Sequence, residues 1–156
     1  MLKKMRKSHS RQAMLGFLAV LAACDTSPRV EAEDAVITLP ALAGRPGAAY
    51  FRLETNQAGD RLLRVETDAA GRAELHETMT AGGMAGMAPL ASAPFDTDGT
   101  LAFTPGGRHA MLFDMKPGFA AGSKAKMTFT FEKAPPLTIV ADVRGPGQGS
   151  ADHQGH

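Results

Sequence analysis

Short runs of alternating apolar and polar residues recur along most of the chain, and segments rich in Gly, Pro, Asp and Asn separate them. The clearest run ends at Phe131, where Met127, Phe129 and Phe131 would share one face of a strand and form part of a core. Short alternating runs divided by turn residues are typical of two-layer all-β domains. Eight runs predict strands: Ala35–Leu39, Ala48–Thr55, Arg61–Thr67, Ala73–Thr78, Leu101–Thr104, His109–Asp114, Lys126–Phe131 and Leu137–Val143.

Composition supports an all-β domain and excludes several other classes. The 156 residues include 17 Gly and 10 Pro, and no segment has sustained helical periodicity, so a helix bundle is excluded. Residues 81–87 are rich in Gly, Ala and Met, and we expect a Gly-rich loop there. The one cysteine, Cys24, excludes a disulfide framework and any site that needs several thiolates.

The first 23 residues are typical of an export signal. Five basic residues and no acidic residue precede or flank an apolar run from Ala13 to Ala23, which is too short for a transmembrane helix. The segment ending Leu21-Ala-Ala-Cys24 resembles a bacterial lipobox, which implies acylation of Cys24 and anchoring to the cell envelope membrane in the periplasm. Ordinary signal cleavage next to an incidental cysteine is the alternative.

Removal of this leader changes the electrostatic character of the chain. Of 17 basic and 16 acidic residues, five basic ones leave, so 12 remain against 16 acids and the net charge becomes −4. A mildly acidic domain without a basic stripe gives no support for nucleic-acid binding. We expect an acidic tether at residues 24–34, the sandwich at residues 35–144 and a flexible tail at residues 145–156.

Histidine and methionine are the residue types that carry candidate chemistry. On a strand, His109 and Met111 would point to the same face about 6.6 Å apart along the chain, with Ala110 on the other face. Thioether sulfur and imidazole nitrogen together favour Cu(I), whereas calcium, magnesium or manganese would prefer oxygen ligands. A blue-copper electron-transfer centre needs a cysteine, which the expected domain lacks.

The spacing of four such residues resembles the bacterial periplasmic copper chaperones called PCuAC. His76 is followed after ten residues by Met87, after 21 more by His109, and after one more by Met111. The family is also resembled by the segments around these residues, Ala73-Glu-Leu-His-Glu-Thr-Met79 and Pro105-Gly-Gly-Arg-His-Ala-Met-Leu112. The resemblance extends from about Ala35 to Val143.

The resemblance implies a cupredoxin-like or immunoglobulin-like Greek-key β-sandwich, and we expect that the protein is not an enzyme. It also implies Cu(I) bound by His76, Met87, His109 and Met111 and delivered to an acceptor, either the CuA subunit of cytochrome c oxidase or a Sco-type protein. A monomer is expected. The alternative function is a copper-sequestering resistance protein without dedicated delivery; a copper oxidase or a hydrolase has no supporting motif.

Other His and Met residues remain weaker candidates. Met84 competes with Met87 for the Gly-rich segment, and His153 and His156 in the tail could bind Cu(II). Met79 and Met115 are expected to pack against the site or the core, and a role as transfer ligands is the alternative. An orienting role for Glu77 is doubtful, because a strand would point it away from the face of its neighbour His76.

Overall fold

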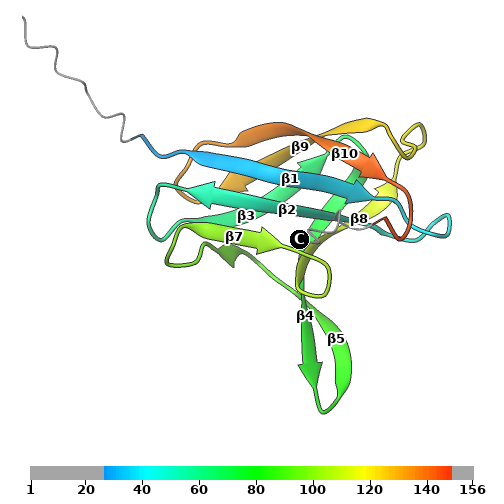
Figure 1. Cartoon of the computed structure of the whole chain (residues 1–156), viewed down its shortest axis with the longest axis horizontal. Coiled ribbons are helices and arrows are strands. Elements are labelled where there is room, and N and C mark those ends of the chain that lie inside the picture. The colour runs from blue at the N-terminus through cyan, green and yellow to red at the C-terminus, as the bar shows by residue number, and fades with distance from the viewer. Residues whose placement is uncertain (1–26, 149–156) are drawn as a thin grey trace, which may run out of the picture.

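The computed structural model describes residues 27–148, which contain ten strands and no helix (Figure 1). No segment in this range could therefore cross a bilayer as a helix. The strands are β1 (Val30–Thr38), β2 (Gly47–Thr55), β3 (Arg61–Thr67), β4 (Ala70–Ala81), β5 (Met84–Pro89), β6 (Ala93–Pro94), β7 (Thr100–Phe103), β8 (Arg108–Met115), β9 (Lys124–Phe131) and β10 (Leu137–Arg144).

One hydrogen-bonded path runs β5-β4-β8-β2-β1-β10-β9-β3-β6, and β7 adds to β2. All pairings are antiparallel except that of β1 with β10. The path folds over on itself, because β3 contacts β4 although the two strands are not neighbours along it. The predicted all-β sandwich is confirmed.

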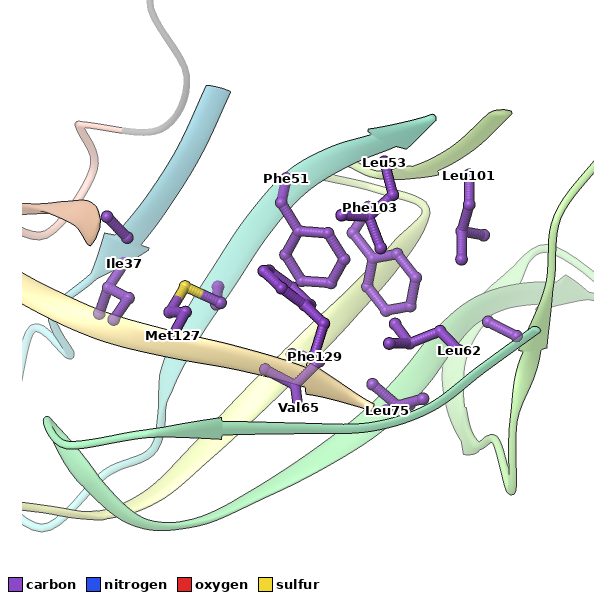
Figure 2. Close-up of a cluster of buried hydrophobic side chains, with 14 of the residues drawn as sticks. Ile37, Phe51, Leu53, Leu62, Val65, Leu75, Leu101, Phe103, Met127 and Phe129 are labelled. Atoms are coloured by element: carbon purple, nitrogen blue, oxygen red, sulfur yellow. The ribbon is translucent and has the colours of Figure 1, made fainter. Parts of the chain in front are cut away.

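The core lies between the two layers and contains a cluster of phenylalanines (Figure 2). Phe51 stacks on Phe103 at 4.5 Å between ring centroids and meets the edge of Phe129 at 4.8 Å. Such ring pairs stabilise a core by about 0.5–1.5 kcal/mol beyond their burial. Met127, Phe129 and Phe131 are all buried, as the alternation predicts.

All eight predicted strands are present, but the expected loop at residues 81–87 is wrong. Those residues instead complete a hairpin of β4 with β5. Ala81 pairs with Met84, so only Gly82 and Gly83 lie in the turn, with φ of 59° and 80°. Two consecutive residues with positive φ match a type I′ turn, whose twist suits a tight hairpin and which glycine adopts without steric cost.

The expected tether at residues 24–34 is wrong for its last five residues, because β1 begins at Val30. Glu31 and Glu33 point outward while Val30 is buried, so the segment is polar on one face only. A bulge between Glu33 and Val36, with Asp34 at φ 52°, interrupts the alternation. At the other end, residues 145–148 form a turn closed by Gln148 N–H donating to Gly145 O at 3.3 Å.

Several predictions fall on residues 1–26 and 149–156, which lie outside the described residues. They concern the leader, the acylation of Cys24, and copper binding by His153 and His156.

A buried carboxylate joins two distant loops. Asp60 is 1% exposed and accepts hydrogen bonds from the backbone N–H groups of Arg61, Lys133 and Ala134 at 2.7–3.0 Å. The connection between β9 and β10 is thereby held against the start of β3.

Candidate metal centre

The two histidines of the four-residue pattern face each other across neighbouring strands. His76 on β4 pairs directly with His109 on β8, and their ring centroids lie 6.0 Å apart with the planes at 28°. Their neighbours Leu75 and Ala110 also pair and are buried in the core. Because side chains alternate along strands, both imidazoles lie on the outer face of the sandwich.

Both methionines of the pattern lie on this same outer face. Met111 follows His109 by two residues on β8 and lies opposite Glu74 on β4. Met87 on β5 lies opposite Thr78, and Thr78 follows His76 by two residues on β4. Each methionine is therefore a diagonal neighbour of His76, at a spacing of about 7–8 Å that long side chains can bridge. We call this set of four side chains, from three adjacent strands at the edge of the sheet, the candidate centre.

Strand alternation separates Met84 and Met79 from the candidate centre. Met84 is three residues from Met87, and Met79 is three residues from His76, so both point to the opposite face of the hairpin. Met79 is 56% exposed, so the expectation that it packs is wrong. Met115 packs against the core near Gly47, in keeping with a structural role.

Hydrogen bonding orients the ring of His109. Its Nδ1 lies 3.0 Å from the carbonyl oxygen of Gly107, two residues earlier. A carbonyl oxygen only accepts, so Nδ1 carries the proton and Nε2 keeps its lone pair. A backbone hydrogen bond of this kind is a common way to fix a metal-binding histidine.

His76 is oriented by a residue that the sequence analysis missed. Its Nε2 lies 3.1 Å from Oε2 of Glu74, whereas its Nδ1 is buried and has no hydrogen-bond partner among residues 27–148. Glu74 also pairs with Arg72, whose guanidinium lies 4.2 Å from the ring centroid of Phe113. Alternation could have identified Glu74, since residues two apart on a strand share a face.

Glu77, the other acidic residue near His76 in the sequence, forms an ion pair with Arg108. Its carboxylate lies 3.4 Å from Nε of Arg108. The sequence-based doubt about an orienting role for Glu77 is consistent with this contact.

Burial is graded across the candidate centre. His109 is 8% exposed, whereas Met87, at the edge, is 58% exposed. On β2, Ala48 lies opposite Met111, and Tyr50 is on the same face of β2 as Ala48. Tyr50 is itself partly buried, and this burial raises the pKa of its phenol. Three side chains of the candidate centre are therefore sheltered and one is open to solvent.

The donor set suits a soft ion. Two imidazoles and two thioethers favour Cu(I). The ring centroids of His76 and His109 are 6.0 Å apart, which leaves room for one ion bound to both rings if the metal–nitrogen bonds are about 2.0–2.1 Å long, as they are for zinc. Within residues 27–148 no group of three or more His, Cys, Asp and Glu side chains could hold an ion.

Residues 30–143 match the model of the family described as Putative lipoprotein LpqE-like. The chain belongs to this family. The match begins at the first residue of β1 and ends one residue before the end of β10, so it covers the whole sandwich. The resemblance to PCuAC proteins is confirmed as well, by the solved apo PCuAC domain from PmoF1, which is 25% identical with a TM-score of 0.60.

A curated relative is the uncharacterised protein RP573 of Rickettsia prowazekii (strain Madrid E), which is 34% identical over 88 residues. The match covers 54% of this chain and 48% of RP573, so the chain spans about half the length of that relative.

Three solved structures have similar folds. The copper-bound PCuAC domain from PmoF2 is 24% identical, with a TM-score of 0.61 over 75% of this chain and 93% of that domain. Apo-DR1885 from Deinococcus radiodurans is 25% identical, with a TM-score of 0.57 over 95% and 99% of the two chains. The CuI form of DR1885 is 26% identical, with a TM-score of 0.60 over 74% and 77%. The cupredoxin-like fold class is thereby confirmed.

Proposed function

We propose that the protein is a copper chaperone of the cell envelope, which binds one Cu(I) through His76, Met87, His109 and Met111 and passes it to an acceptor protein. The observation that carries this proposal is the direct pairing of His76 with His109, with a methionine diagonal to His76 on either side. The copper named for the PmoF2 domain and for DR1885 supports the choice of metal.

The hydrogen bonds of the two histidines suggest which nitrogens bind the ion. His109 would use Nε2, because its Nδ1 donates to Gly107 O. His76 would use Nδ1, because its Nε2 faces Glu74 and a carboxylate accepts a proton donated by that nitrogen. The Glu74–His76 contact is then a carboxylate–histidine–metal arrangement, in which the carboxylate makes the imidazole a better ligand.

Release would begin at Met87. This thioether lies on the edge strand β5 and is the most exposed of the four side chains, so an acceptor ligand can approach from its side. Cu(I) would move by ligand exchange: an acceptor sulfur or nitrogen binds the ion as the Met87 sulfur leaves, and no electron is transferred. Thioethers carry no proton, so the departure of Met87 from the ion neither takes up nor releases one.

The cellular setting follows from the leader and the family. Anchoring through Cys24 would place the protein on the periplasmic side of a membrane, where two or more acyl chains hold a protein stably. The acceptor would be the CuA subunit of cytochrome c oxidase or a Sco-type protein. The role of the present protein would be binding and delivery rather than catalysis, because four protein ligands leave no open position on the ion for a substrate.

A deletion strain separates delivery from sequestration. Delivery predicts loss of oxidase activity at limiting copper, restored by the wild-type gene and by added copper but not by a His76→Ala/Met111→Leu variant. Glu77→Gln is the matched control and should restore activity. Normal oxidase activity at limiting copper, combined with poor growth at excess copper, would favour the sequestering alternative.

A further inference from the structure

The outer part of the β4–β5 hairpin projects from the sandwich (Figure 1). Strand β8 begins at Arg108, which pairs with Glu77, and the Thr78 N–H donates to Gly107 O at 3.2 Å, so residues 79–81 of β4 pair with β5 only. Met79 and Met84 lie in this part, on the face opposite the candidate centre, and are 56% and 77% exposed. Exposed large apolar side chains that gather in one place usually mark a binding site.

The hairpin register brings these two thioethers together. Met79 pairs with Gly86, and Met84 lies two residues before Gly86 on the same strand. Met79 and Met84 are therefore diagonal neighbours on one face, at a spacing of about 7–8 Å that two long side chains can close.

Gly86 leaves the space between the two methionines open. It has no side chain, and nothing lies within 4 Å of the position that a Cβ would occupy. Glu77 lies two residues before Met79 on the same face, and its carboxylate is paired with Arg108. The two thioether sulfurs can therefore approach each other over Gly86 without displacing a neighbouring side chain.

We propose that Met79 and Met84 form a second Cu(I) site, in which the two thioether sulfurs bind one ion above Gly86. Thioether sulfur selects Cu(I) among the biological metal ions. With two ligands instead of four, this site binds more weakly than the candidate centre and fills after it. The proposal goes beyond the function proposed above and does not depend on it.

The test is a titration of the full chain with Ag(I), a redox-stable probe for Cu(I), monitored by NMR of the methionine ε-methyl groups. The first equivalent should shift the methyl signals of Met87 and Met111, and further Ag(I) should shift those of Met79 and Met84 together. Met79→Leu and Met84→Leu, which keep volume but remove sulfur, should each weaken the second event by at least about tenfold. Met115→Leu is the matched control and should leave both events unchanged.

Each outcome decides one proposal separately. The second site is overturned if the methyl signals of Met79 and Met84 stay fixed at several equivalents, if only one of them moves, or if the double Leu variant binds the second ion normally. Fixed signals for Met87 and Met111 would overturn the candidate centre alone, because the response of Met79 and Met84 is recorded independently.

Discussion

Oε2 of Glu74 lies 3.1 Å from Nε2 of His76, on the outer face of β4. The Arg72 side chain contacts the same carboxylate and lies over Phe113, so Glu74 is held from its other side. This chain of contacts fixes the ring of His76 in the protein before any metal arrives. It makes Glu74 a positioning residue for the candidate centre.

Replacing Glu74 by Gln should weaken Cu(I) binding by about 10–100-fold, the usual effect of losing an outer carboxylate partner. Competition with a chromophoric Cu(I) chelator measures the affinity. Nitrogen-15 NMR of the imidazoles should also show a changed tautomer population for His76 and an unchanged one for His109. Glu77→Gln is the control; equal affinities for both variants would exclude the positioning role.

Met87, rather than Met84, should bind the first equivalent of Cu(I), because only Met87 shares a face with His76. Met87→Leu is expected to weaken the first binding event by more than about tenfold, since a direct ligand contributes at least as much as an outer partner. Chelator competition provides the measurement, with Met115→Leu as control. A Met87→Leu protein of wild-type affinity would remove Met87 from the centre.

The turn at Gly82 and Gly83 should control the position of Met87. Gly82 has φ 59°, which a β-branched residue tolerates poorly, at a cost of about 1–2 kcal/mol. Gly82→Val should therefore loosen the hairpin and weaken Cu(I) binding, whereas Gly82→Asn retains an Asn-Gly type I′ turn and wild-type binding. Amide hydrogen exchange at residues 84–87 reports the hairpin directly, and equal protection in both variants would contradict this account.

Asp60 should contribute strongly to stability without affecting the metal. Asp60→Ala removes a buried carboxylate that accepts three backbone hydrogen bonds, so we expect a loss of about 2–4 kcal/mol in the free energy of unfolding. Urea denaturation measures it. Glu54→Gln, at an exposed ion pair with Arg52, should change stability by less than about 0.5 kcal/mol. Similar losses in both variants would argue against the role of Asp60.

The fold was predictable where alternation was clean and the strands were long. The run ending in Met127, Phe129 and Phe131 has its apolar side chains on one face, and all three are buried. Strand β5 was missed because it lies at the sheet edge with little burial, so its composition lacks an apolar stripe. The start of β1 was missed because a bulge at Asp34 interrupts the alternation.

The candidate site was partly predictable for a similar reason. Spacing and alternation predict that His109 and Met111 lie on one face of a strand, and in the structure both lie on the outer face of β8. The resemblance favoured Met87 over Met84, and the hairpin register, which depends on the two-residue turn at Gly82 and Gly83, puts Met87 on the face of His76. Alternation places Glu74 on the same face as His76, but only the side-chain contacts show that its carboxylate reaches both His76 and Arg72.

X-ray absorption spectroscopy of the protein loaded with one equivalent of Cu(I) tests the central claim most directly. The account predicts a first coordination shell with two imidazole nitrogens and two thioether sulfurs, and loss of one sulfur in Met87→Leu. A shell that contains only nitrogen and oxygen scatterers would contradict it.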